Sequence, residues 1–170
     1  MPEVIPCRAE HAIETAWVIN QAKPDYVRIR TLEIFNGTPL DVMRERGELT
    51  EADDDTVVRE VRRLVQEIDV DTELLSDSAT NLLQINGRLP GDRERMLSEI
   101  DDFLRLEPRE RLEYSLRSRL AAFTGQYGGL SEEVLEEVSP VLDGRSFDMS
   151  SASDSELKKM TAFVKSRLMP

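Results

Sequence analysis

The chain begins with apolar residues at helical spacing and then changes to the alternation typical of a strand. Residues 10–23 form the first predicted helix, which ends at Pro24 because proline lacks a backbone donor. Residues 25–32 have a period of two, which predicts a strand. The expected apolar face of the helix consists of Ile13, Trp17, Val18 and Ile19. The two faces of the strand carry Tyr26, Arg28 and Arg30, and Val27, Ile29 and Thr31.

Turn and capping residues predict two helices after this strand. Thr38 is the expected N-cap of the first, with Pro39 at its first position and Gly47 at its C-terminal end. Thr50 is the expected N-cap of the second, with Asp53 in the place of the capping-box acid. The apolar stripe of this second helix consists of Val57, Val58, Val61, Leu64, Val65 and Ile68.

A second strand is predicted at residues 72–75 and leads into a polar loop at 76–80. A strand, a long helical crossover and another strand imply a parallel pair with helices on its outer face. The glycines and proline of "NGRLPGD" predict a loop, and only helices are expected after it. These later helices span residues 92–106, 108–123 and 131–142, with a break at "TGQYGG".

The predicted fold is a helix-rich α/β structure with an incomplete sheet, since two parallel strands leave both edges open. Either the strands pair with a second chain, or helices cover the edges, or the chain is the end of a larger α/β domain. We divide the chain into an α/β unit (1–90), a helical segment (91–142), a polar linker (143–155) and a terminal helix (156–170). The apolar face of the terminal helix consists of Leu157, Met160, Phe163, Val164 and Leu168.

Two runs in the first part of the chain resemble a known family. "HAIETAWVINQAKPDYVRIRTLEIFNGTPLDVMRERGELT", followed by "LLSDSATNLLQINGRLPGDRERMLSEID", is similar to the C-terminal part of radical S-adenosylmethionine (radical SAM) proteins of the coproporphyrinogen-oxidase-like and elongator-like type. The resemblance covers roughly residues 11–101. It implies the last two strand-helix units of a partial (β/α) barrel, with the C-terminal helical segment added.

The resemblance suggests why a strand between helices carries arginines. In such a barrel Val27 and Ile29 would face the outer helices, while Arg28 and Arg30 would face the lumen. There a guanidinium group suits a carboxylate or phosphate of a cofactor or substrate. The alternative is that both arginines are solvated or pair with nearby acids such as Glu33.

Thr38, Asp77 and Asn81 complete the set of candidate cofactor-binding or substrate-binding residues. Asp77, Ser78 and Asn81 follow the second predicted strand, where polar residues can reach a ligand. Their alternative role is to cap a turn, which is common for these residue types. The sequence predicts no catalytic residue, because it contains no nucleophile and base at a recognisable spacing.

The family holds a [4Fe-4S] cluster with a CxxxCxxC loop, and Cys7 is the only cysteine in this chain. The cluster and S-adenosylmethionine are therefore implied only for a complete family member, and we expect no cofactor for this chain alone. His11, the only histidine, is expected at the surface. The acids of "EADDD" are expected at a helix N-terminus, so no metal site is predicted.

The net charge of the chain argues against two classes of binding partner. With 22 basic and 34 acidic residues the net charge is -12, which argues against binding to DNA or to an anionic membrane surface. No apolar run approaches the ~20 residues of a membrane span, and we expect a cytoplasmic protein.

Two functional hypotheses follow. In the first, the chain is a C-terminal domain or truncated form of a radical SAM enzyme, which contributes lumen-lining residues and is not an enzyme alone. In the second, it is a stand-alone homodimer, joined through open strand edges, that binds a partner through its helical half.

Overall fold

The computed structural model describes residues 8–168 except 36 and 145, with backbone alone at 8 and 9. The chain divides into two compact units, Met1–Arg105 and Leu106–Pro170, called here the first and the second unit. Each unit is described by itself.

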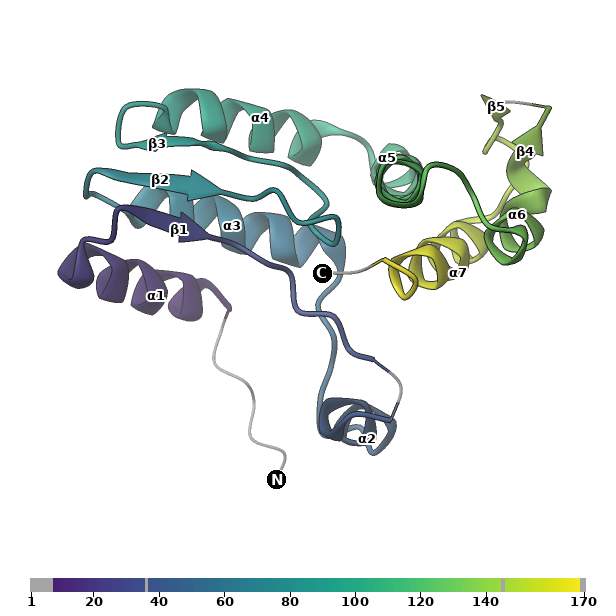
Figure 1. Cartoon of the computed structure of the whole chain (residues 1–170), viewed down its shortest axis with the longest axis horizontal. Coiled ribbons are helices and arrows are strands. Elements are labelled where there is room, and N and C mark those ends of the chain that lie inside the picture. Colours follow the sequence, from purple (N-terminus) through teal and green to yellow (C-terminus); the bar gives the residue numbers. More distant parts are fainter. Residues whose placement is uncertain (1–7, 36, 145, 169–170) are drawn as a thin grey trace. The chain divides into compact units, whose positions relative to one another are not determined.

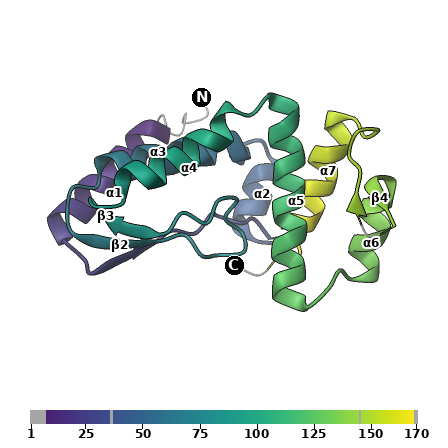
Figure 2. The same ribbon diagram turned by 90° about the horizontal axis from the view of Figure 1, so that it is seen from above.

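The first unit is a small sheet with helices packed on one of its faces (Figure 1). The strands lie in the order β1–β2–β3, with β1 parallel to β2 and β3 antiparallel to it, so the predicted parallel pair is confirmed. The view from above shows α1, α3 and α4 side by side on the same face (Figure 2). The elements are α1 (Arg8–Ala22), β1 (Tyr26–Arg28), α2 (Pro39–Glu45), α3 (Asp54–Glu67), β2 (Thr72–Leu75), β3 (Gly87–Leu89) and α4 (Arg93–Arg105).

The core of the first unit lies between the sheet and these helices. Leu74 and Leu89 face the helices and are fully buried. The helices contribute Val58, Leu64, Val65, Met96, Ile100 and Phe103 to this core. The opposite side, called here the outer face, carries the exposed residues Tyr26, Arg28, Glu73 and Arg88. The helix-rich α/β class is thus confirmed, with helices covering one side of the sheet.

The predicted apolar face of the first helix is confirmed at Ile19 and wrong at its other three residues. Trp17 is 63% exposed and Val18 is 56% exposed, and Ile13 is also exposed. α1 buries Ala12 and Ala16 together with Ile19 and packs against α3. The two alanines allow a close approach between the helices, which an indole ring on that face would prevent.

Several boundaries also differ from the expected ones. The N-cap of α3 is Asp53, whose carboxylate accepts from the Thr56 amide, and so Thr50 is not the cap. "NGRLPGD" contains β3, which pairs with β2 and which we expected to be a loop. β1 is limited to Tyr26–Arg28, although the alternation extends further. The predicted caps of α2 are confirmed, since Thr38 is its N-cap and Gly47 follows its end with a φ of 70°.

The second unit is built from helices and one short hairpin. α5 packs against α7, and α6 packs against α7 as well. α5 continues four residues beyond the predicted end at 123 and stops at Gly128, which adopts a left-handed φ of 79°. The elements are α5 (Pro108–Tyr127), α6 (Glu132–Val138), the 3-10 turn η1 (Ser139–Val141), β4 (Leu142–Asp143), β5 (Ser146–Phe147) and α7 (Asp154–Lys165).

Residues 143–155, expected to be a polar linker, contribute to the packing of the second unit. β4 pairs with β5, and the side chains of Met149 and Ala152 are buried. The apolar stripe of the terminal helix is largely as expected, with Leu157, Met160, Val164 and Leu168 buried. The chain divides after Arg105, whereas the sequence analysis placed a boundary at residue 90, because α4 packs on α3.

Candidate functional site

Two of the candidate residues meet at the carboxyl ends of the parallel strands. Arg28 is the last residue of β1, and Asp77 comes two residues after β2. The Arg28 Nε–Asp77 Oδ1 distance is 2.8 Å and the Nη2–Oδ2 distance is 3.0 Å, which makes the pair bidentate. These hydrogen bonds from Arg28 lower the pKa of Asp77, and the nearby charge of Arg30 lowers it further. Asp77 is therefore ionised at neutral pH, and the partner of Arg28 is this acid and not Glu33.

Arg30 lies beside this pair with its charge directed to solvent. Its side chain is exposed and forms no ion pair with any residue that the structure describes. The positive charge of Arg30 adds a smaller contribution to the lowered pKa of Asp77 than the hydrogen bonds from Arg28 do. The group therefore carries one guanidinium neutralised by Asp77 and a second one that remains available to an anion.

The side chain of Asn81 is buried and forms four hydrogen bonds within the protein. Its Oδ1 accepts from the Thr31 amide at 2.7 Å and from the Thr31 hydroxyl at 3.0 Å. Its Nδ2 donates to the Ile29 carbonyl and to the Ser76 hydroxyl, both at 2.9 Å. Both amide protons and the amide oxygen are thus engaged within the protein. Asn81 therefore joins the segment after β1 to the loop after β2 and is a positioning residue.

Further hydrogen bonds between polar groups hold the loop after β2. Asn86 Oδ1 accepts from the Ser76 amide at 2.7 Å, and the Ser76 hydroxyl donates to the Leu83 carbonyl at 2.9 Å. The hydroxyl groups of Ser78 and Thr80 lie 2.9 Å apart. Thr31, Ser76 and Asn86 were not predicted as part of the site, although Ser76 could have been indicated by its position directly after the apolar residues of β2.

Thr38 does not contribute to this group in the structure. Its hydroxyl donates to the Phe35 carbonyl at 2.7 Å and accepts from the Asp41 amide at 3.3 Å. Both hydrogen-bonding functions of the side chain serve the start of α2. Thr38 therefore acts here as a helix cap.

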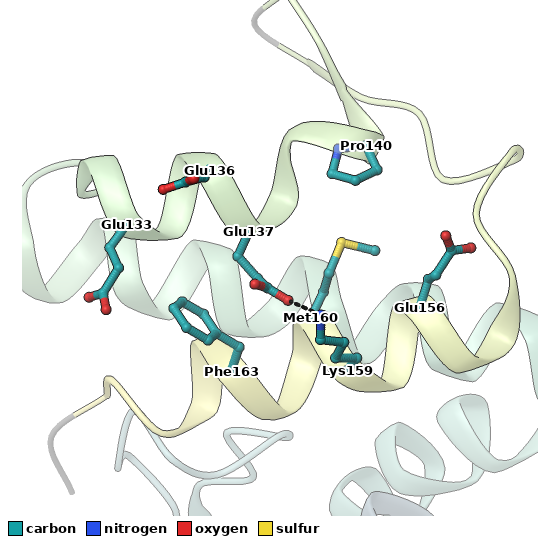
Figure 3. A pocket seen from close by; sticks show the side chains of 8 residues that line it. All are labelled: Glu133, Glu136, Glu137, Pro140, Glu156, Lys159, Met160 and Phe163. Carbon is teal, nitrogen blue, oxygen red and sulfur yellow. Dashed lines mark ion pairs between the residues drawn. The ribbon is translucent and has the colours of Figure 1, made fainter.

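A second candidate site is an open hollow of about 350 Å³ between α6 and α7 in the second unit (Figure 3). Glutamates surround an apolar floor, and Lys159 Nζ lies 3.6 Å from Glu137 Oε1. The guanidinium of Arg167 holds Glu133 by two hydrogen bonds, which lower the pKa of this carboxyl. The lining residues are Glu133, Glu136, Glu137, Pro140, Glu156, Lys159, Met160 and Phe163.

The residues present do not fit an iron-sulfur cluster. Cys7, the single cysteine, lies outside the described residues, and His11 Nδ1 is 2.5 Å from Glu60 Oε1. Within the described part of the chain, no three His, Cys, Asp or Glu side chains are grouped so that they could hold a metal ion. The chain by itself lacks the thiolate ligands that a cluster requires.

The described helices include none that is both long and apolar enough to cross a lipid bilayer. Comparisons of the chain with protein-family models, with curated proteins and with solved structures found no match.

Proposed function

We propose that this chain forms the last two strand-helix units of a radical SAM barrel and contributes ligand-binding residues to its lumen. The proposal rests on the sequence resemblance together with one observation. Arg28 is exposed on the outer face of the sheet, at the strand end where it meets Asp77. In a (β/α) barrel this side faces the lumen, and this end of the strands surrounds the active site.

The charges favour a ligand that carries an anionic group. Arg28 is held in place by Asp77, so its orientation is fixed before a ligand binds. Arg30 supplies the available cation, and its planar group suits a carboxylate or phosphate of S-adenosylmethionine or of a substrate. Asn81 keeps the two strand ends together. The radical chemistry itself would require the three-cysteine loop, which this chain does not contain.

The size and iron content of the native product test this function. An antibody against the chain would capture the product anaerobically from source cells, and its mass and iron content would be measured. We expect a polypeptide clearly larger than 19.4 kDa that carries iron. A product of 19.4 kDa without iron would refute the proposal.

The role of Arg30 is tested in the same captured enzyme with Arg30→Met. A charged hydrogen bond is worth about 1.5–3 kcal/mol, so we expect S-adenosylmethionine or substrate to bind at least about tenfold more weakly. Arg46→Met, at an exposed arginine that follows α2, is the matched control and should leave binding unchanged. Equal binding by both variants would remove Arg30 from the site.

A second candidate function is binding of a basic protein segment by the second unit. The hollow between α6 and α7 combines Met160, Phe163 and Pro140 with glutamates, of which Glu136 is exposed. An amphipathic helix with basic residues would match both the apolar floor and the acidic rim. This function would need no other part of a barrel.

The second candidate is tested with a fluorescent amphipathic peptide of lysine and leucine. We expect Met160→Gln to weaken binding, because it places a polar group in the floor of the hollow. Met43→Gln, at an exposed methionine of α2, is the control. A loss of affinity that is equal for both variants, or no binding by the unaltered chain, would exclude this function.

A further inference from the structure

The sheet of the first unit has two edges, and the edge along β1 is open. The Ile29 amide donates to the Leu75 carbonyl at 2.8 Å, so the odd-numbered residues of β1 direct their backbone groups toward β2. Because these groups alternate along a strand, those of Tyr26 and Arg28 point away from the sheet. They form no hydrogen bond with the described residues, so another strand could pair with them.

At the opposite edge, the outward backbone groups of β3 are already bound. Gly87 and Leu89 lie opposite the β2 residues whose backbone groups face β3, so the groups of Arg88 point outward. The Arg88 amide donates to Asp92 Oδ2 at 2.8 Å, and the Arg88 carbonyl accepts from the Asp92 amide, also at 2.8 Å. Asp92 therefore occupies both outward groups of the central residue of β3.

The residues on either side of Arg88 are occupied as well. The Asn86 carbonyl accepts from Arg95 Nη2 at 2.8 Å. Pro90 has no amide proton, and its carbonyl accepts from the Arg93 amide at 3.3 Å. α4 begins directly after this segment and packs against β3 (Figure 1). The start of α4 thus binds the groups that a further strand would need.

The close approach of these side chains accounts for a glycine inside the strand. A Cβ atom at Gly87 would lie 2.6 Å from Arg95 Nη2 and 2.9 Å from Asp92 Oδ2, and both distances are too short for a carbon atom. A glycine in a strand often marks such an approach. Gly87 therefore leaves the room in which Asp92 and Arg95 reach the backbone of β3.

We infer that the start of α4 closes the β3 edge to strand addition, so that a further strand can extend this sheet only beside β1. The closed edge concerns this chain alone and does not depend on the proposed function. Which strand lies beside β1 does rest on the proposed function, under which it is the preceding strand of the same, longer polypeptide.

Hydrogen exchange of single amides, measured by NMR on the whole chain, tests the closed edge. Relative to its rate in an unfolded chain, the Arg88 amide should exchange at least about tenfold more slowly than the open Arg28 amide. Asp92→Ala removes the charged acceptor and should speed exchange at Arg88 at least about tenfold. Asp92→Asn keeps an acceptor oxygen and should restore much of the protection. Glu94→Ala, at an exposed acid in the first turn of α4, is the control and should change nothing.

Gly87→Ala tests the same contacts without removing any of the groups that form them. The added methyl group should displace the side chains of Asp92 and Arg95 and speed exchange of the Arg88 amide. Gly125→Ala is the control, because a Cβ atom at this glycine of α5 has no atom within 4 Å. Circular dichroism of both variants would confirm that they fold.

A disulfide test asks whether two β3 edges can pair with each other. In a Cys7→Ser background, Arg88→Cys would be oxidised at high protein concentration. Antiparallel pairing of two β3 strands about this position would place the two thiols within disulfide range, with Cα atoms about 5.5 Å apart. We expect no more covalent dimer than with Glu94→Cys, whose exposed position reports random collisions.

Three results would overturn the inference. One is an Arg88 amide that exchanges as fast as the Arg28 amide. Another is an equal effect of Asp92→Ala and Glu94→Ala on the exchange at Arg88. The last is a clear excess of covalent dimer for Arg88→Cys over Glu94→Cys. A native product of 19.4 kDa would refute the proposed function and leave these three measurements unchanged.

Discussion

At the scale of single residues, the buried polar side chain of Thr72 is expected to reduce the stability of the fold. Its side chain is fully buried in β2, and its hydroxyl has no hydrogen-bond partner among the described residues. Burying an unpaired hydroxyl costs about 1–3 kcal/mol, and valine has nearly the same shape. Thr72→Val should therefore raise the free energy of unfolding by about 1 kcal/mol. Urea denaturation would measure this, with the exposed Thr124→Val as a control expected to change little.

Asn81 differs from Thr72, because both polar atoms of its side chain form hydrogen bonds within the protein. Asn81→Ala would leave the partly buried Thr31 amide and Ile29 carbonyl without their partners. We expect a loss of about 2–4 kcal/mol in the free energy of unfolding, since each unsatisfied buried group costs about 1–3 kcal/mol. Gln84→Ala, at an exposed position of the same loop, should be nearly neutral. Similar unfolding midpoints for the two variants would contradict the proposed role of Asn81.

At the scale of elements, an ion pair joins α3 to α4. Arg62 Nε lies 2.6 Å from Asp101 Oδ1, and the hydrogen bond lowers the pKa of Asp101 below its usual value. A carboxyl group with a lowered folded-state pKa stabilises the fold above its unfolded pKa, and this stabilisation is lost as the pH falls through the folded value. Asp101→Asn should therefore destabilise the chain by about 1 kcal/mol or less at pH 7. The difference between the two proteins should shrink as the pH falls below about 4.

The control for this pair is Asp102→Asn on the same helix. Among the described residues Asp102 bonds only to Arg105 of α4 itself, and both side chains are well exposed. Its loss should change stability much less, because exposed pairs within a helix contribute little. A pH profile of Asp101→Asn that runs parallel to that of the unaltered chain would contradict a coupling between α3 and α4 through this pair.

At the scale of the whole molecule, the division after Arg105 predicts which fragment folds. Residues 1–105 should unfold cooperatively on heating, because this fragment retains the sheet and all three of α1, α3 and α4. Residues 1–90 should not, because this fragment lacks the buried Met96, Ile100 and Phe103. Circular dichroism during a thermal scan would distinguish the fragments. Cooperative unfolding of both would place the boundary at residue 90, as the sequence analysis did.

Prediction from sequence succeeded where neighbouring residues decide the structure. Thr38 and Pro39 start α2 as expected, and β2 has the predicted bounds of 72–75. The pairing of Arg28 with Asp77 could be anticipated only in part. The sequence placed Asp77 at the end of the second strand but Arg28 in the middle of a strand predicted at 25–32, and the contact between them depends on the parallel pairing of β1 with β2.

Prediction from sequence failed where contacts with a segment far along the chain determine the structure. Nothing local distinguishes the Ile13–Trp17 side of α1 from the side that α3 covers. β3 has three residues and contains Gly87, so only its pairing with β2 identifies it as a strand.

The sequence by itself determined the caps of α2, most helices, the parallel strand pair and the absence of a three-cysteine loop. These depend on backbone chemistry over a few residues or on composition. The tertiary structure alone decided which face of α1 is buried, the third strand, the Asn81 network and the division after Arg105. Each of these depends on contacts between segments far apart in the chain, which local propensities do not encode.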